Sequence, residues 1–315
     1  MTDRPACSLW MFVARTDVAF MMQTIPHIVR MCDYPFVEKV LAIDVAEPSG
    51  EKRQRPHLAD LSEIRERCAE LLGDGVVDRV IDIEYSDSYR KKLYKKHFGL
   101  PRVKGTHNYK GYPVLGSMFC IEECRTDHMV HFDSDMLLYQ KGGYDWISEG
   151  ISQLDMDAEL IWVRPQAGPE PGMFAEGGGE KINKVPAFAS RAYLFDIRKL
   201  EEILPLTALW AKRQGKTKER VPRFVLNAYH RITGGGILDS WEKIMTRGLK
   251  EKERFGSWMY HGDDCWTLHP CDHGHDFIKA LPEIIERVER GEYPPEQAGK
   301  YDLDLGVWLR FLGKQ

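Results

Sequence analysis

The 315-residue chain lacks the long apolar runs of a membrane-spanning protein. The apolar stretch Leu9–Ala14 is closed by Arg15, and a spanning helix needs about 20 such residues. Residues 1–5 are polar and do not have the layout of a signal peptide. We therefore expect a cytoplasmic protein, with peripheral contact to a membrane left open.

The chain also lacks paired cysteines and an excess of positive charge. Its 7 cysteines are scattered without regular spacing or a Cys-x-x-Cys pair, which argues against a disulfide framework and favours a reducing compartment. The formal net charge is −4, and the basic cluster at residues 90–96 is typical of a solvated helix face. We expect no nucleic-acid partner.

Alternating strands and helices fill the first third of the chain. Ser8–Ala14 and Val37–Val45 are short apolar runs typical of buried strands, and Val18–Cys32 between them has mostly helical spacing. This order predicts parallel strand pairing with a right-handed crossover. A helix over Leu58–Leu72 and a strand over Val76–Ile83 continue the pattern.

Further along, the pattern becomes less regular. Pro113 begins a predicted helix that ends near Arg125, and Met129–Phe132 is a fourth strand. Strands are predicted at residues 160–163 and 191–197, helices at 198–204, 237–246 and 277–290, and either type at 224–232. The long loops at residues 87–112 and 165–186 have the length of lids or binding loops. No clean domain boundary appears, so one enlarged α/β domain is expected.

The sequence Asp133-Ser134-Asp135 follows the fourth predicted strand directly. The carboxyl ends of strands in an open parallel sheet face the ligand crevice. Two carboxylates at such a turn can reach one ion, and Mg²⁺ and Mn²⁺ prefer carboxylate oxygens and share their sites with substrate phosphates. The motif therefore predicts a divalent-metal site, against the alternative of two acids that cap a turn.

With this motif in this position, the chain resembles the GT-A glycosyltransferases from Ser8 to about His275. The resemblance implies a Rossmann-like, mixed but mostly parallel central sheet flanked by helices, in a single enlarged domain over residues 1–290. Residues 1–140 would form the nucleotide-sugar-binding half, residues 141–290 the acceptor-binding half, and residues 291–315 a C-terminal extension. Mn²⁺ or Mg²⁺ on Asp133 and Asp135 would hold the diphosphate of a UDP- or GDP-sugar.

The same resemblance suggests donor contacts. Positions at the ends of the first two strands contact the base and ribose in the family, and here they are Ala14, Arg15, Thr16 and Asp44. Ser134 within the motif, Lys110 in the long loop and Gly235 in the glycine-rich turn Thr233–Gly236 complete the predicted set. Glycine at such a turn allows close backbone approach to a ligand.

The predicted catalytic carboxylates come from a later motif. Gly262-Asp263-Asp264 is similar to the x-Glu-Asp motif of inverting family members, where an acid serves as general base. Asp264 is the candidate base, and Asp263 occupies the glutamate position. The stretch Ala189–Leu200 looks like a segment of retaining members but has Arg191 where glycine is usual, so we favour inversion.

A histidine-rich cluster follows. Family members often supply a late histidine to the metal or diphosphate, for which His269 is the first candidate and His273 the second. A rival interpretation is a zinc site of Cys265, His269, Cys271 and His273, although this spacing matches no common zinc pattern.

Other functions stay open at this point. A nucleotidyltransferase acting on sugar phosphates shares the sheet and the metal carboxylates, but residues 13–17 lack its glycine-rich signature. A metal-dependent hydrolase built on residues 261–275 and a non-catalytic nucleotide-sugar-binding protein are further alternatives. The acceptor, whether glycan, lipid-linked or small molecule, and the oligomeric state are not indicated by the sequence.

Overall fold

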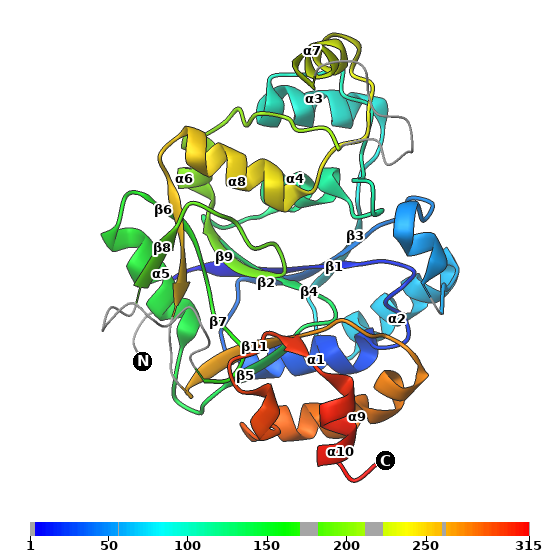
Figure 1. Ribbon diagram of the computed structural model, residues 1–315, viewed down its shortest axis with the longest axis vertical. Coiled ribbons are helices and arrows are strands. Elements are labelled where there is room, and N and C mark those ends of the chain that lie inside the picture. The colour runs from blue at the N-terminus through cyan, green and yellow to red at the C-terminus, as the bar shows by residue number, and fades with distance from the viewer. Residues whose placement is uncertain (1–3, 56, 171–181, 212–222, 260–262, 315) are drawn as a thin grey trace.

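An eight-stranded sheet runs through the middle of the molecule in the order β3-β2-β1-β4-β9-β6-β10-β8 (Figure 1). The computed structural model describes residues 4–55, 57–170, 182–211, 223–259 and 263–314. The strands are β1 (Cys7–Val13), β2 (Glu38–Ile43), β3 (Arg79–Asp82), β4 (His128–Asp133), β5 (Leu137–Gln140), β6 (Leu160–Arg164), β7 (Gln166–Ala167), β8 (Ile182–Val185), β9 (Ala192–Asp196), β10 (Phe255–Met259), β11 (Cys265–Pro270) and β12 (Asp302–Leu303).

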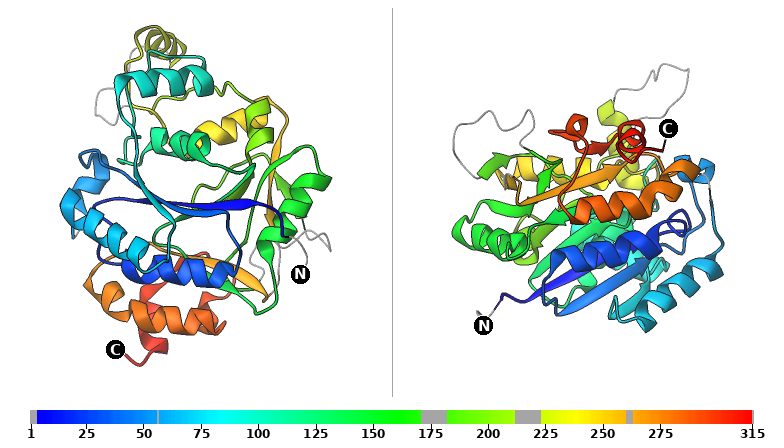
Figure 2. Two further views of the ribbon diagram at one scale, coloured as in Figure 1. Left: turned by 180° about the vertical axis from the view of Figure 1, so that it is seen from behind. Right: turned by 90° about the horizontal axis from the view of Figure 1, so that it is seen from below.

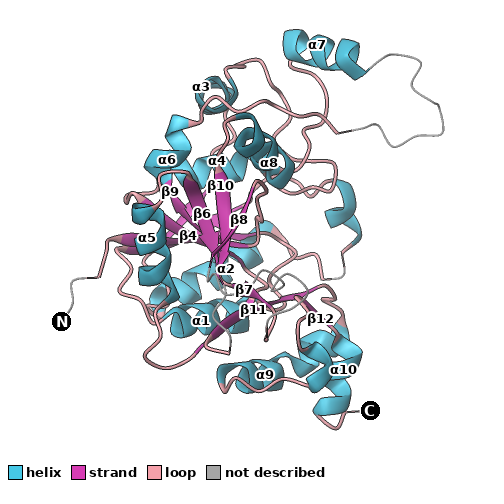
Figure 3. Cartoon of the chain, turned by 60° about the vertical axis from the view of Figure 1, so that its left-hand side comes forward, coloured by secondary structure: helices cyan, strands magenta, loops and turns pink. Residues whose placement is uncertain are grey.

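Helices cover both faces of this sheet (Figures 1 and 3). They are α1 (Met21–Cys32), α2 (Leu61–Gly73), α3 (Asp87–Phe98), α4 (Val114–Glu123), α5 (Trp146–Met156), α6 (Ile197–Glu202), α7 (Arg223–Thr233), α8 (Trp241–Glu251), α9 (His275–Glu289) and α10 (Leu305–Phe311), with short 3₁₀ helices η1 (Gly50–Gln54) and η2 (Pro295–Gln297).

Strand β1 shows why the chain folds into layers. Its side chains alternate across the sheet, so Trp10 joins the core under α4 and α8, while Leu9 and Met11 join the core under α1 and α2. Since both faces are buried, a strand without polar alternation suits the central position.

The strand directions match the predicted mixed sheet. β1 pairs in parallel with β2 and with β4, and β2 pairs in parallel with β3. β9 is antiparallel to both of its neighbours, β4 and β6. The predicted fold class, a mostly parallel α/β sheet flanked by helices, is therefore confirmed.

A second, smaller sheet of β12, β11, β5 and β7 lies beside the first, with α9 and α10 packed against it (Figure 2). Because β5 begins just after Asp135, the Asp-x-Asp turn lies where the chain leaves the central sheet for the small one. His27 ties the layers together. Its Nε2 accepts the Leu138 N–H at 3.1 Å, and its Nδ1 donates to Glu289 Oε1 at 2.8 Å.

Several elements differ from the sequence predictions. Residues 87–98 form α3 rather than loop, and 224–232 lie in a helix. The strands of the small sheet went unpredicted because β5 and β11 are short and irregular in pattern. The predicted extension, residues 291–315, contributes β12 and α10 to the small sheet and its helix layer. Half of the predicted 165–186 loop, residues 171–181, lies outside the described residues.

All seven cysteines are free thiols, as the absence of a disulfide framework predicted. In the described parts of the chain, no helix has both the length and the apolar character needed to span a bilayer.

Candidate functional site

The Asp133-Ser134-Asp135 turn is held by hydrogen bonds to α1 and to the segment between β1 and α1. The Met136 N–H closes the turn on the Asp133 carbonyl at 3.1 Å. Ser134 is buried, and its hydroxyl donates to Asp17 at 2.8 Å while its carbonyl accepts from Thr24 at 2.5 Å. Ser134 therefore holds the turn in place, and its hydroxyl is engaged with Asp17.

Asp135 has two very different oxygen atoms. Its Oδ2 accepts from His273 Nε2 at 3.0 Å and lies 4.0 Å from His269 Nε2. Its Oδ1 is buried, and no hydrogen-bond donor among the described residues reaches it. Burial alone would raise the pKa of Asp135, but His273, His269 and Arg191 outweigh it and lower the pKa. A buried ionised oxygen without a donor calls for a further partner.

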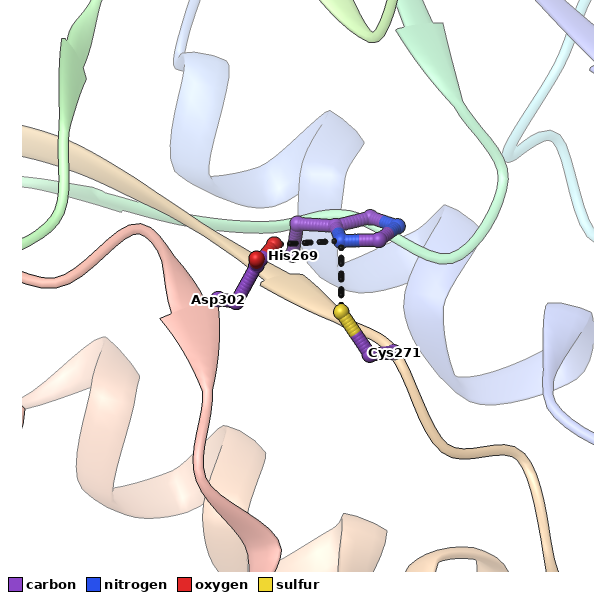
Figure 4. A group of neighbouring side chains, drawn as sticks. All are labelled: His269, Cys271 and Asp302. Atoms are coloured by element: carbon purple, nitrogen blue, oxygen red, sulfur yellow. Dashed lines mark hydrogen bonds and ion pairs between the residues drawn. The ribbon is translucent and has the colours of Figure 1, made fainter.

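The orientation of His269 follows from its second ring nitrogen (Figure 4). Nδ1 lies 2.9 Å from the Asp302 carboxylate, which only accepts, so Nδ1 carries the proton. Burial lowers the pKa of His269, which favours the neutral ring. The Nε2 lone pair is thus directed toward Asp135, and a carboxylate that orients a histidine in this way is a common support for a metal ligand.

His273 has the opposite tautomer. Arg55 Nη1 lies 2.7 Å from His273 Nδ1, and because arginine only donates, this nitrogen accepts. The proton is then on Nε2, directed at Asp135. His273 therefore serves as a hydrogen-bond donor to Asp135, and of the two predicted histidines His269 is the better suited to a metal.

Asp133 is the last residue of β4, the strand that pairs with β9 from the second half of the chain. Its side chain is 35% exposed, and its Oδ1 lies 3.2 Å from Nε2 of the buried His131. The His131 ring packs between Phe12 and Tyr193, with centroid distances of 4.6 and 4.8 Å. This packing fixes His131, which sequence reasoning treated only as part of a strand.

The donor set of Asp133, Asp135 and His269 suits a hard divalent cation, because it offers two carboxylates and one imidazole. The ligand atoms of these three residues are not yet gathered around one point. In the described part of the chain, two groups of three side chains have ligand atoms within 4.8 Å of one another, His269/Cys271/Asp302 and His128/Asp155/Asp196, and neither contains the Asp-x-Asp acids. The orphaned Asp135 Oδ1 shows that the residues fit such an ion.

The predicted four-residue zinc site is not formed. Cys265 begins β11 and is fully buried, whereas His269 lies near the other end of that strand. At about 3.4 Å per residue, the two are about 14 Å apart along the strand. Cys265 and His269 therefore do not share one metal centre.

A pocket opens at the ends of β1 and β2, where the resemblance placed the donor nucleotide. Its lining comprises Ala14, Arg15, Thr16, Asp44, Ala46, Glu47, Pro48, Lys52, His107 and Gly111. The structure thus brings together four of the predicted contacts. His107 was missed, since it lies in a loop without a recognisable period.

Asp44 is the most constrained residue of this pocket. Its carboxylate accepts from Tyr85 at 2.8 Å, from His107 at 3.2 Å and from the Ala46 N–H at 3.2 Å. Burial alone would raise its pKa, but His107 and Lys52 outweigh this and lower the pKa. A carboxylate has about four acceptor sites, so about one remains for a ligand.

Lys110 lies beside the pocket on a loop that touches η1 backbone to backbone. Gly111 has φ +91°, and a Cβ atom there would lie 2.0 Å from the Ser49 carbonyl oxygen. The Lys110 ammonium is 44% exposed and lies 3.7 Å from Glu51. It is therefore free to turn toward a ligand at the pocket rim.

Gly235 lies elsewhere. Its neighbour Gly234 has φ +68°, and a Cβ atom there would lie 1.7 Å from the Arg102 carbonyl oxygen. The Lys104 N–H donates to the Gly234 carbonyl at 2.9 Å. This glycine turn therefore packs against residues 102–105, and its close backbone approach is to the protein.

Asp263 and Asp264 are not brought to the Asp-x-Asp turn. Cys265 pairs with Gln140 and Leu268 with Leu137, so Asp264 lies at the far end of the small sheet, about 14 Å along the strand from the motif. Its carboxylate is 43% exposed and pairs with Lys141 at 2.9 Å. Asp263 is also exposed.

A different carboxylate, that of Glu242, lies close enough to the Asp-x-Asp centre to be influenced by its charge. It lies in the first turn of α8, within electrostatic range of Asp133, Arg191 and Arg164. Desolvation raises its pKa, Asp133 adds to this, and the two arginines oppose it, although the side chain stays open to solvent. An acid in a first helical turn is common for helix stability alone, so no distinct signal marks Glu242 in the sequence.

Two arginines complete this side of the site. Arg164 is 4% exposed, lies 4.7 Å from the centroid of Tyr301 and 5.7 Å from that of Trp258. Arg191 also lies over Tyr301 and is 3.5 Å from Asp302. The position that departs from the retaining pattern thus supplies a cation next to the acidic centre.

No known family model matches the chain, and no curated protein matches it significantly. Among solved structures, the fold is similar to "GalNAc-T7 with UDP, GalNAc and Mn2+", with a TM-score of 0.50 and 9% identity. The match covers 85% of this chain and 44% of that one, so the chain spans less than half of that protein. At this identity the likeness shows the fold alone, a mixed α/β sheet flanked by helices.

Proposed function

We propose that the protein is a divalent-metal-dependent glycosyltransferase that uses a nucleotide-sugar donor. The observation that carries this proposal is Asp135 Oδ1, a buried oxygen that no donor of the described residues reaches, on the side chain toward which the lone pair of His269 is directed. In a GT-A fold, this place at the strand ends is where ligands bind.

Asp133, Asp135 and His269 would hold Mn²⁺ or Mg²⁺ there. When bound, the cation stabilises the negative charge that develops on the departing diphosphate. Arg55 has a second role, since it donates to Tyr112 at 3.1 Å as well as to His273. Arg55 and Arg191 border the acidic centre on two sides and supply further positive charge toward phosphate oxygens.

The pocket at Ala14, Thr16 and Asp44 would take the nucleoside part of the donor. Asp44 has about one acceptor position left, which suits a single N–H or O–H of a base or ribose. A UDP-sugar is the first choice of donor, because the structural neighbour binds UDP, and a GDP-sugar is the second.

For the acceptor, we propose Glu242 as general base in an inverting reaction, in place of Asp264. A base must lie within hydrogen-bond reach of the attacking hydroxyl, and Glu242 is a carboxylate of the second half of the chain within electrostatic range of Asp133. Desolvation raises the pKa of Glu242 above its ordinary value, which is the direction that a general base requires. The acceptor stays open between a glycan, a lipid-linked sugar and a small molecule.

Thermal stability against a panel of UDP-, GDP-, CMP- and dTDP-sugars, each with and without Mn²⁺, tests this proposal. A ligand that binds only the folded state raises the melting temperature. We expect a Mn²⁺-dependent rise for one nucleotide class, which is lost in Asp135→Asn and kept in Asp264→Asn. A panel without any rise, in protein that is folded, would reject the proposal.

A further inference from the structure

Three side chains of different chemistry meet on the outer side of His269 (Figure 4). Cys271 Sγ lies 3.4 Å from His269 Nδ1, and Asp302 Oδ1 lies 2.9 Å from the same nitrogen. The three ligand atoms all fall within 4.8 Å of one another. A carboxylate alone is enough to orient a histidine, so the thiol is an additional feature.

The separations resemble those of a tetrahedral metal site. With Zn–S of about 2.3 Å and Zn–N or Zn–O of about 2.0–2.2 Å, neighbouring ligands stand about 3.4–3.6 Å apart. The sulfur–nitrogen distance of 3.4 Å already matches, and the nitrogen–oxygen distance of 2.9 Å needs to open by about half an ångström.

The scaffold of this group is built from paired strands. His269 pairs with Asp302 in the parallel β11–β12 ladder, and the His269 N–H donates to the Tyr301 carbonyl at 3.0 Å. Cys271 follows the end of β11 directly and is exposed, and the Asp302 side chain is 63% exposed. The group is therefore held in position and open to ions from solution.

We propose that Cys271, Asp302 and Nδ1 of His269 bind a thiophilic divalent cation such as Zn²⁺, with water as the fourth ligand. The combination of thiolate, imidazole and carboxylate favours Zn²⁺ over Mg²⁺ or Mn²⁺. On binding, the Cys271 thiol releases its proton to solvent, and the His269 proton moves from Nδ1 to Nε2. Arg191, 3.5 Å from Asp302 Oδ1, competes with the cation for this oxygen.

Occupancy of this site changes what His269 offers to Asp135. With a cation on Nδ1, Nε2 carries the proton and donates toward Asp135 Oδ2, 4.0 Å away. It can then no longer act as a ligand of a second ion. Zn²⁺ would thus withdraw His269 from the Asp-x-Asp centre and weaken Mn²⁺ binding. This consequence rests on the proposed function, whereas the cation site itself does not.

Cobalt binding tests the site directly, because Co²⁺ reports a thiolate ligand by a charge-transfer absorption. The reduced full-length protein is titrated with Co²⁺ and then with Zn²⁺. We expect the absorption to appear, to be displaced by Zn²⁺, to vanish in Cys271→Ser and to need at least tenfold more Co²⁺ in Asp302→Asn. Cys124→Ser, at another accessible cysteine, should leave it unchanged. A band that persists in Cys271→Ser, or fails to appear in the wild type, overturns the site.

Mn²⁺ binding measured by the electron paramagnetic resonance of the free ion tests the coupling. One equivalent of Zn²⁺ should weaken Mn²⁺ binding about tenfold or more in the wild type and leave it unchanged in Cys271→Ser. Equal loss in both proteins would show that Zn²⁺ simply replaces Mn²⁺ and would overturn the coupling. A cobalt band together with no Mn²⁺ binding at all would support the cation site and reject the proposed function.

Discussion

Two buried carboxylates stand at the ends of neighbouring parts of the sheet, Asp44 after β2 and Asp135 after β4, and they have opposite surroundings. Asp44 accepts from Tyr85, His107 and the Ala46 N–H. Asp135 accepts from His273 on one oxygen, while no described donor reaches the other. The protein therefore fills most of the hydrogen-bond acceptor positions of Asp44, whereas Asp135 keeps one oxygen available for a ligand.

The difference shows that an acid after an apolar strand has no fixed meaning by itself. Both positions follow buried strands and carry the same functional group. What separates them is the number of donors brought from distant parts of the chain. A carboxylate whose acceptor positions are filled by the protein contributes to stability, whereas one with an open acceptor position can also bind a ligand.

The largest effect that we expect is the loss of metal-dependent function in Asp135→Asn. The amide keeps the shape but removes the charge from the site, so Mn²⁺ binding and transfer should fall by about 10³-fold or more. The free protein should keep most of its stability, because the amide oxygen can still accept from His273 and no described donor to the other oxygen is lost. Initial rates, Mn²⁺ titration and urea unfolding measure the three quantities. A normal rate with Mn²⁺ would contradict the assignment.

The second effect distinguishes the two candidate bases. Glu242→Gln should lower kcat by about 10²- to 10⁴-fold, the usual share of a general base, and leave Mn²⁺ binding unchanged. Asp264→Asn, the matched control, should change kcat less than about threefold, since it lies about 14 Å along the strand from the motif. The reverse ranking in steady-state kinetics would restore Asp264 as the base.

The sequence was sufficient to predict the fold class and four residues that line the pocket at the strand ends. Apolar strands and helical periods predicted the parallel β1–β2 pairing and the flanking helices. The resemblance placed donor contacts at Ala14, Arg15, Thr16 and Asp44, and these four residues line one pocket because a parallel sheet brings the carboxyl ends of its strands to one edge.

The remaining site residues depend on contacts that no local pattern encodes. Asp302 reaches His269 through β12, a strand of two residues in the predicted extension. Arg55 is hydrogen-bonded to His273, although the two residues are 218 positions apart in the sequence. The pair Asp263 and Asp264 was chosen from a motif whose strand, β11, pairs in a register that carries both acids away from Asp135. Register was not available from the sequence.

The third effect tests the saturated member of the comparison. Asp44→Asn places an NH₂ group against at least one of the donors Tyr85, His107 and Ala46. The free energy of unfolding should fall by about 2–3 kcal/mol, as for a lost charged hydrogen-bond acceptor in a buried place. Urea unfolding of Asp44→Asn and Asp135→Asn measures the contrast. Equal changes in the two proteins would mean that donor counts do not separate their roles.

The smallest effect extends the comparison to Glu289, a carboxylate outside the site that has two donors from the protein. Glu289 accepts from His27 and Arg30, which lower its pKa to about 2. Because the pKa is lower in the folded state, the stabilisation is present above the ordinary value of 4.5 and is lost as pH falls toward 2. The side chain is 29% exposed, so solvent screening limits the effect to about 1 kcal/mol.

Unfolding of the wild type and of Glu289→Gln, compared at pH 6 and pH 3, measures this contribution. The stability difference between the two proteins should be largest at pH 6, where the Glu289 carboxylate is charged and receives the His27 Nδ1–H. It should shrink at pH 3, because part of the wild-type advantage is lost when protons compete for that carboxylate. An unchanged difference would mean that the contact between α1 and α9 contributes by packing, and that saturation of a carboxylate need not stabilise the fold.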